Sequence, residues 1–298
     1  MKEWIVGRNP VYEVLRAHRR DIFRLWLASG VQEKGRIQEI QSLAASRRVA
    51  VSHVLRSQVD ALGENPQGIA LEVSAYPYVD LMDILHVSQA RQEPLFVLIL
   101  DQIQNPQNLG SLIRTAEAVG MHGIVLPLAH SVGVTPAVVS ASAGACEHML
   151  MAQSNLAQAI AILKEAGIWV VGLDHSPESQ SADQIKLTGP LAIVVGSEGE
   201  GIRSLVRGSC DFLMRLPMVG KVESLNAGVN HVFWTKSGTS YHLYSDCSYI
   251  NTDRTVEIFE GTVAQARDLK NITDICDRCA NRAVKEKGLD AKLAEPVR

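Results

Sequence analysis

The chain has 298 residues, of which 46% are hydrophobic and 20% charged, a composition that supports a packed core and excludes wholesale disorder. Its net charge of −3 gives no global basic signature of a nucleic-acid-binding protein, and no uncharged apolar run approaches the roughly 20 residues of a membrane helix. The N-terminal sequence lacks the apolar stretch of a secretory signal, so we expect a cytoplasmic protein without a membrane partner.

The first 78 residues form the first predicted domain. Their pattern predicts helices at 9–18 and 34–47, and strands at 24–28, 49–54 and 68–73. This segment holds 11 Lys and Arg against 8 Asp and Glu, which favours an anionic partner. Residues 79–93, which end in a polar stretch, are predicted to be a linker.

The next segment, residues 94–227, shows continuous apolar runs separated by helical patterns. The runs predict buried strands at 96–100, 123–126, 168–173 and 191–195, and the patterns between them predict helices at 109–119, 136–145 and 155–166. Strands alternating with helices indicate an α/β fold with a mostly parallel sheet. In such sheets, ligands bind in the loops after the carboxyl ends of the strands.

The first such loop follows strand 96–100 and runs Asp101-Gln102-Ile103-Gln104-Asn105-Pro106-Gln107-Asn108. Asn108 is predicted to cap the helix behind it, and Arg114 lies on the second turn of that helix, where it could point back toward the loop. The guanidinium group has a fork of donors that matches phosphate oxygens. The alternative is that Asn108 only caps and Arg114 is a solvated surface charge.

The second loop, after strand 191–195, is glycine-rich and reads Gly196-Ser197-Glu198-Gly199-Glu200-Gly201-Ile202. Its glycines permit close backbone approach to a ligand, but it has neither the ending of a phosphate loop nor the Rossmann spacing. Its two acids favour a nucleoside or a cationic ligand, and the alternative is an ordinary turn. The third loop follows 211–216 and contains Ser224-Leu225-Asn226, which offers a hydroxyl and an amide for hydrogen bonds.

The order and spacing of the three loops resemble the motifs of the SpoU (TrmH) family of RNA ribose 2′-O-methyltransferases, at residues 105–120, 193–202 and 216–226. The N-terminal segment Gly7-Arg8-Asn9-Pro10-Val11, with Gln67-Gly68-Ile69, resembles the substrate-binding domain of the subfamily that methylates a guanosine of large-subunit (23S) rRNA. The resemblance covers residues 5–226. It implies a trefoil-knotted parallel sheet of the SPOUT type and a homodimer whose active site forms across two chains.

The resemblance also implies the ligands and the roles of individual residues. S-adenosylmethionine is the expected cofactor, held at Gly196, Leu216 and Leu225, with rRNA as the partner. Arg114 is expected to orient and stabilise the ribose hydroxyl, with Asn108 holding the arginine or the ribose. Glu198 is expected to order its loop by pairing with Arg114. Ser224 and Asn226 are expected to position the substrate. For the first domain, the candidates for phosphate contact are Arg8, Arg16, Arg19, Arg20 and Arg24.

The sequence departs from the family after Asn226. The family continues with a long helix that threads the knot, whereas Gly228 and the β-branched and aromatic residues after it are poor helix formers. Residues 232–235 and 240–243 are instead predicted to form a hairpin. A small Cys/His-rich module, residues 228–280, is thus predicted to replace the last helix of the family. A charged tail, residues 281–298, follows this module.

This module has the ligand types of a structural zinc site. His242, Cys247, Cys276 and Cys279 give the spacing His-x4-Cys-x28-Cys-x2-Cys, which matches tetrahedral zinc coordination. The alternative is three reduced cysteines and a surface histidine.

Three functions remain open on the sequence alone. The first is a S-adenosylmethionine-dependent RNA 2′-O-ribose methyltransferase. The second is a non-catalytic RNA-binding protein that kept the scaffold but lost a complete cofactor pocket. The third makes the C-terminal module an interaction module and the rest its carrier.

Overall fold

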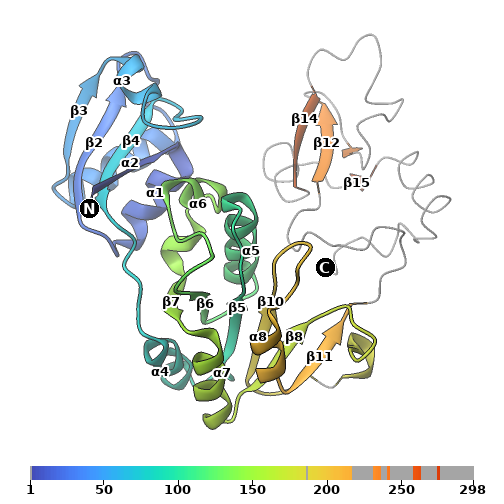
Figure 1. The fold of residues 1–298 in the computed structure, drawn as a ribbon. Helices are drawn as coiled ribbons and strands as arrows, with labels where there is room; N and C mark the ends of the chain where they lie inside the picture. Colours follow the sequence, from blue (N-terminus) through green and yellow to red (C-terminus); the bar gives the residue numbers. More distant parts are fainter. Residues whose placement is uncertain are drawn as a thin grey trace. The chain divides into compact units, whose positions relative to one another are not determined.

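The computed structural model describes residues 2–185, 187–216, 231–235, 240–241, 258–262 and 274–275. The chain divides into two compact units, Met1–Pro217 and Met218–Arg298 (Figure 1). The division lies upstream of the boundary predicted near Gly228. Among the described residues, no helix is both long and apolar enough to cross a bilayer.

The first unit begins with a four-stranded sheet in the order β1-β4-β2-β3. Its strands are β1 (Lys2–Val6), β2 (Ile22–Ala28), β3 (Ala50–Val54) and β4 (Ile69–Ser74). Strand β4 is antiparallel to both of its neighbours, whereas β2 and β3 are parallel. Helices α1 (Arg8–Ala17) and α2 (Arg36–Ser46) bury their apolar sides against one face of this sheet, and the short α3 (Arg56–Asp60) packs on the other face.

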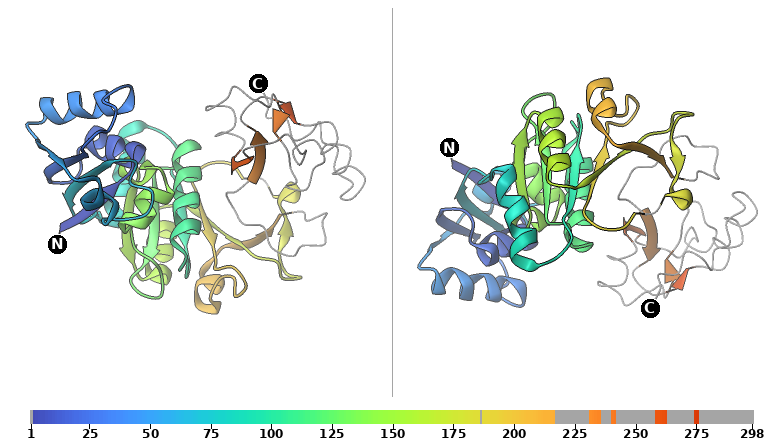
Figure 2. Two further views of the ribbon diagram at one scale, coloured as in Figure 1. Left: turned by 90° about the horizontal axis from the view of Figure 1, so that it is seen from above. Right: turned by 90° about the horizontal axis from the view of Figure 1, so that it is seen from below.

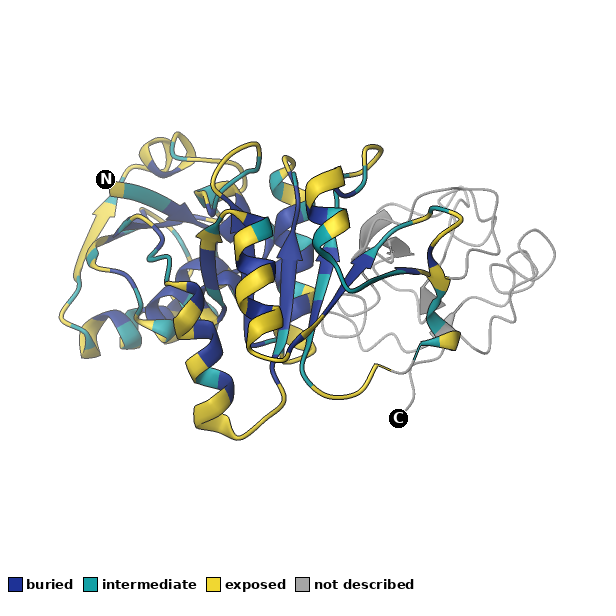
Figure 3. Cartoon of the chain, turned by 60° about the horizontal axis from the view of Figure 1, so that its bottom comes forward, coloured by how far each residue is buried: buried dark blue, intermediate teal, exposed yellow. Residues whose placement is uncertain are grey.

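A seven-stranded, entirely parallel sheet follows, in the order β7-β6-β5-β10-β8-β11-β9. Its strands are β5 (Phe96–Leu100), β6 (Gly123–Pro127), β7 (Leu150–Ser154), β8 (Trp169–Leu173), β9 (Gln180–Ser181), β10 (Leu191–Val195) and β11 (Phe212–Arg215). The prediction of an α/β fold with a parallel sheet is confirmed. The central strands are buried, as the dark blue arrows in Figure 3 show, because helices cover both faces.

The two helical layers follow from the period-2 alternation of the strands. In β5, Leu98 and Leu100 face α5 (Pro106–Ala118) and α6 (Pro136–Ala141), whereas Val97 and Ile99 face α4 (Leu81–Arg91), α7 (Leu156–Glu165) and α8 (Ser204–Ser209). Figure 2 shows these helices around the sheet from above and below. Two single 3₁₀ turns, η1 (Ala145–His148) and η2 (Ala182–Gln184), complete the unit.

The interpretation of residues 79–93 as a linker is wrong. They contain α4, whose Leu81, Ile84 and Leu85 are buried against the parallel sheet. The spacing of these three residues places them on one side of the helix, and the polar end of the segment obscured that pattern.

In the second unit, β12 (His231–Thr235) pairs antiparallel with β14 (Ile258–Thr262), and β13 (Ser240–Tyr241) pairs in parallel with β15 (Asp274–Ile275). The strand predicted at 232–235 is confirmed, but the hairpin between it and 240–243 is wrong. A strand pattern reports the period of a segment and not its partner, and both partners here come from further along the chain.

Candidate active site

Two of the three predicted loops lie side by side because β5 and β10 are parallel neighbours, with Leu100 opposite Val195. The amide of Asp101 donates to the carbonyl of Val195 at 2.8 Å, so the two loops leave the sheet together. Between them lies a cavity of about 330 Å³. It is lined by Gln102, Ile103, Gln104, Asn105, Asn108, Ser197, Glu198 and Glu200.

The loop after β10 is a tight turn that needs its glycines. Ser197 and Gly201 exchange two backbone hydrogen bonds, each 3.0 Å long. Gly199 and Gly201 have φ values of +97° and +70°, which L-residues rarely adopt. A Cβ atom on Gly196 would lie 2.1 Å from the carbonyl carbon of Gly201, so only glycine fits there.

Asn108 and Glu198 meet across this cavity. The Asn108 side-chain amide donates to Glu198 Oε2 at 3.3 Å. Asn108 does not cap α5, because Asn105 accepts from the amide of Gln107 at 2.8 Å and Pro106 occupies the first helical position. The Asn108 side chain instead links the loop after β5 to the loop after β10.

Arg114 lies on α5 and is half-buried. The pairing predicted between Arg114 and Glu198 is not formed; Glu198 accepts a hydrogen bond from Asn108 instead. Among the residues that the structure describes, Arg114 makes no hydrogen bond or ion pair, so its guanidinium group retains its donors for a ligand.

Sequence reasoning missed an ion pair at the base of the two loops. Asp101 is fully buried and accepts from the backbone amide of Arg203 at 2.9 Å and from its Nε at 2.8 Å. The Arg203 Nη2 atom lies 2.7 Å from the same carboxylate. The sequence signal that could have indicated this pair was an acid, Asp101, directly after a buried strand and a base, Arg203, directly after the glycine-rich loop.

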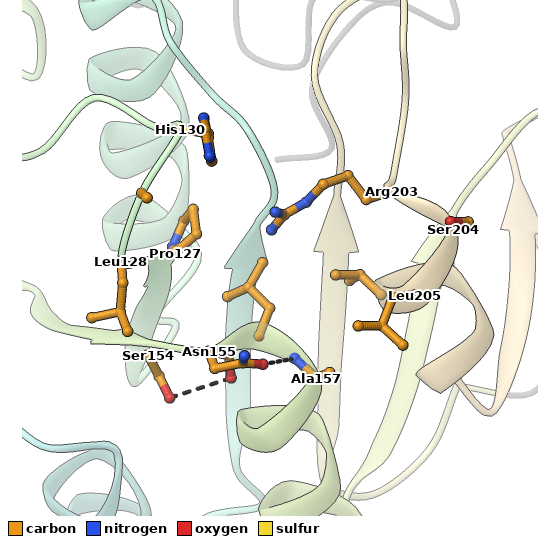
Figure 4. Close-up of a pocket in the computed structure, with 12 residues that line it drawn as sticks. Pro127, Leu128, His130, Ser154, Asn155, Ala157, Arg203, Ser204 and Leu205 are labelled. Atoms are coloured by element: carbon orange, nitrogen blue, oxygen red, sulfur yellow. Dashed lines mark hydrogen bonds between the residues drawn. The ribbon is translucent and has the colours of Figure 1, made fainter.

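A second cavity, of about 440 Å³, opens at the same edge of the sheet beyond Arg203. Figure 4 shows the Arg203 guanidinium group, His130 and the start of α7 around it. Its walls include two leucines that are about 70% exposed, Leu128 at 70% and Leu205 at 71%.

The predicted cofactor positions are partly described. Gly196 follows β10, and Leu216 follows β11 with 44% of its surface exposed. Strand β8 lies between these two strands, so the positions are separated by two strand spacings, about 10 Å. Leu225, Ser224 and Asn226 lie outside the described residues.

The predicted zinc ligands His242, Cys247, Cys276 and Cys279 also lie outside the described part of the chain. Within that part, no group of three or more His, Cys, Asp or Glu side chains could hold a metal ion. The two cysteines described there, Cys146 and Cys210, are free thiols whose pKa values burial raises to about 12 and about 11.

Three of the five arginines predicted to contact phosphate are already engaged within the protein. Arg20 is buried against Glu147, and Arg24 is paired with Glu72. Arg19 donates to the hydroxyl of Tyr76 and to backbone carbonyls. Arg16 is exposed and lies 3.6 Å from Glu13.

Comparison with known proteins relates both domains of the first unit to a family of RNA methyltransferases. The model of the SpoU rRNA methylase family matches residues 95–231, and that of the RNA 2′-O ribose methyltransferase substrate-binding domain matches residues 4–79. YacO of Bacillus subtilis, assigned to the TrmH family of tRNA/rRNA methyltransferases, is 43% identical over 76% of this chain and 91% of its own length. A Mycobacterium leprae protein named as a tRNA/rRNA methyltransferase is 40% identical over 76% of this chain and 74% of its own.

Solved structures agree at the level of the fold. The SpoU methyltransferase AviRb from Streptomyces viridochromogenes, in complex with AdoMet, has a TM-score of 0.63 and 24% identity over 76% of this chain and 84% of its own. An AdoMet-bound rRNA methyltransferase from Sinorhizobium meliloti has a TM-score of 0.61 and 23% identity over 75% of this chain and 81% of its own. The chain therefore belongs to the SpoU/TrmH family of tRNA/rRNA methyltransferases.

Proposed function

We propose that the protein transfers a methyl group from S-adenosylmethionine to a ribose 2′-hydroxyl of RNA, and that the target is a guanosine of 23S rRNA. The observation that supports this function best is the cavity in which Asn108 and Glu198 join two loops of the parallel sheet. A site at the carboxyl ends of parallel strands is where such a fold binds ligands.

The described residues fit the cofactor. A nucleoside needs apolar faces and backbone donors at a narrow opening. Gly196 leaves the backbone of the turn uncovered by a side chain, and Leu216 presents an exposed apolar surface about two strand spacings, ~10 Å, away. We propose that Gly196, Leu216 and Leu225 hold the adenosine part, with the methyl group carried on a sulfonium.

The reaction forms a bond between the ribose oxygen and the methyl carbon, breaks the sulfur–carbon bond, and releases the hydroxyl proton. Arg114 cannot accept that proton at neutral pH, because a guanidinium group stays protonated. We assign Arg114 to holding the ribose and an adjacent phosphate, so that a phosphate oxygen takes the proton. Asn108 and Glu198 fix the cavity wall, and Ser224 and Asn226 position the RNA.

The test is methyl transfer by Arg114→Ala. The rate of transfer from labelled S-adenosylmethionine to rRNA is expected to fall by about 10²–10³-fold, as for removal of one stabilising donor. The dissociation constant of the cofactor should stay within about twofold of the wild-type value, since Arg114 is assigned to the ribose and the phosphate and not to the cofactor. Arg91→Ala is the matched control, because Arg91 is exposed in the last turn of α4. Transfer by Arg114→Ala at the wild-type rate would remove the assignment.

One observation favours a second candidate, a non-catalytic RNA-binding protein. Residues 231–235 form strand β12 where the family has a helix that covers the cofactor. Calorimetric titration with S-adenosylmethionine separates the two candidates: micromolar binding supports the enzyme, and an absence of binding supports the second candidate.

We further propose a homodimer in which each active site forms across two chains, an expectation that rests on family membership. Sedimentation equilibrium of the full chain should give twice the mass of 32.5 kDa. A monomer that still transfers methyl groups would contradict the shared site.

For the C-terminal module, we propose a structural zinc ion bound by His242, Cys247, Cys276 and Cys279. Ligand type and spacing support the proposal. Purified protein should then contain one zinc per chain, and Cys276→Ser should lower this content. Stoichiometric absence of zinc from protein purified without chelators would refute it.

A further inference from the structure

The outer face of the first sheet carries an unusual row of aromatic and cationic side chains. Its inner face holds the aliphatic residues that pack on α1 and α2. On the outer face, Trp4 of β1, Glu72 of β4 and Arg24 of β2 share one row across three strands. The next row contains Trp26 of β2 opposite Ala70 of β4.

The two tryptophans meet above the central strand. Their ring centroids are 4.4 Å apart, and the ring planes are inclined by 43°. Trp4 pairs with Glu72 and Trp26 pairs with Ala70, so the two rings approach each other diagonally across β4. Contact at this distance is possible because Ala70, against whose cluster both rings pack, has only a methyl group. Both rings stay half-buried, so part of each indole is open to solvent.

Arg24 lies against both rings. Its guanidinium carbon is 5.3 Å from the centroid of Trp4 and 5.0 Å from that of Trp26, within the range of cation–π contact. Its Nε donates to Glu72 Oε2 at 2.8 Å. The Glu72 side chain is only 10% exposed and that of Arg24 is 46% exposed, so the carboxylate holds the guanidinium group from below and leaves its outer side open.

A bulge extends this surface. The register between β2 and β4 shifts between Ile22 and Arg24, which inserts Phe23 as an extra residue. Phe23 is 39% exposed, and Lys2 Nζ lies 4.2 Å from its ring centroid. We call these five residues, Lys2, Trp4, Phe23, Arg24 and Trp26, the aromatic platform.

The platform has the chemistry that recognises unpaired bases. Aromatic and guanidinium planes stack on the faces of bases, and only unpaired bases offer those faces. The charges agree, because the two cations Lys2 and Arg24 surround the single carboxylate of Glu72 and leave net positive charge for a phosphate. A solvated structural surface would need neither the exposed Phe23 nor the open guanidinium plane.

We propose that the aromatic platform stacks unpaired bases of the RNA substrate. The proposal rests on the proposed function in one respect, that the substrate is RNA, and it adds that the first domain grips a single-stranded segment. Stacking does not depend on base identity, so the platform supplies affinity, and the choice of nucleotide is made elsewhere.

The test measures binding of a fluorescently labelled oligoadenylate, and of an RNA hairpin without unpaired bases in its stem, to the full chain by anisotropy. The wild type should bind the oligoadenylate more tightly than the hairpin, with quenching of tryptophan fluorescence. Arg24→Gln, Trp26→Leu and Phe23→Ala should each weaken oligoadenylate binding by about tenfold. Trp169→Phe is the control, since Trp169 is 55% exposed at the start of β8, outside the platform.

Phe23→Ala keeps the test decisive if Trp26→Leu fails to fold, because Phe23 is exposed at a bulge. Equal affinity for oligoadenylate and hairpin, no binding of oligoadenylate, or unchanged binding by the folded variants would each overturn the platform. Methyl transfer to rRNA is measured in parallel. Platform-dependent binding without transfer refutes the proposed function alone, and transfer with platform-independent binding refutes the platform alone.

Discussion

A buried ion pair joins the two sheets of the first unit, and replacing its members tests how the unit is held together. Arg20 lies between α1 and β2, and Glu147 lies in η1 beside the parallel sheet. Arg20 Nη2 lies 2.7 Å from Glu147 Oε1, and Nε donates to Oε2 at 3.1 Å. Both side chains are fully buried.

The cost of breaking the pair should depend on which partner is removed. Loss of one partner from a buried pair costs about 3–5 kcal/mol of unfolding free energy, because the other charge is left uncompensated. Arg20→Met leaves Glu147 with the Cys146 thiol at 3.6 Å among the described residues, so we expect the upper end, ~5 kcal/mol. Glu147→Gln leaves Arg20 with Glu3 at 3.1 Å and the Ser74 carbonyl at 3.3 Å, so we expect ~3 kcal/mol.

The assay is urea unfolding, followed by circular dichroism and by tryptophan fluorescence to test for a single transition. The double variant Arg20→Met/Glu147→Leu replaces both charges by apolar groups and should recover most of the loss. Arg16→Met is the control, since Arg16 is exposed and lies 3.6 Å from Glu13, and it should cost less than about 1 kcal/mol.

Two results would refute this reasoning. One is a cost for Arg20→Met no larger than that of Arg16→Met. The other is a double variant whose loss equals the sum of the single losses, since residues in direct contact should be coupled by about 0.5–3 kcal/mol.

Two further predictions concern the turn and the junction. Gly196→Ala should weaken S-adenosylmethionine binding by at least about tenfold while the chain stays folded, because its Cβ would meet the Gly201 carbonyl carbon at 2.1 Å and distort the turn. Gly208→Ala is the control, since a Cβ atom at Gly208 in α8 would meet open space. Calorimetric titration of both variants with S-adenosylmethionine measures the effect. Burial raises the pKa of the Tyr76 hydroxyl above its ordinary value of 10.0, so the unfolded chain releases that proton first and stability should fall as the pH rises above about 10. Tyr76→Phe should make the slope of stability against pH smaller in urea titrations between pH 9 and 11, and part of the slope should remain because burial also raises the pKa values of Cys146 and Cys210. An equal slope in both proteins would contradict the assignment.

The buried sheet could be predicted from the sequence because continuous apolar runs carry their own signal. The runs at 96–100 and 191–195 match β5 and β10 residue for residue. Strand β1 was missed because it is short, begins with two charges and lies at an edge of its sheet. Helix α4 was missed because its polar end resembles a linker.

The site could be predicted only to the level of its loops. Parallel strands bring their following loops to one edge, so the loops that contain Asn108 and Glu198 were expected at the same edge of the sheet, with Arg114 as the predicted partner of Glu198. The contact itself could not be predicted, because it depends on Asn105 taking the cap of α5. The Asp101–Arg203 pair was missed for a similar reason. The two residues are 102 positions apart in the sequence, and only the register of β5 and β10 brings them into contact.

The arginines of the first domain show how structure changes the meaning of composition. Their number indicates a phosphate-binding surface, yet Arg20 is buried in an ion pair, and Arg19 donates hydrogen bonds to the Tyr76 hydroxyl and to backbone carbonyls. Buried cations cannot release counterions from RNA, so fewer phosphate contacts remain for affinity than the composition indicates. The binding energy must then come from another source, and Arg24 held against Trp4 and Trp26 offers base stacking, which salt screens much less than phosphate contact.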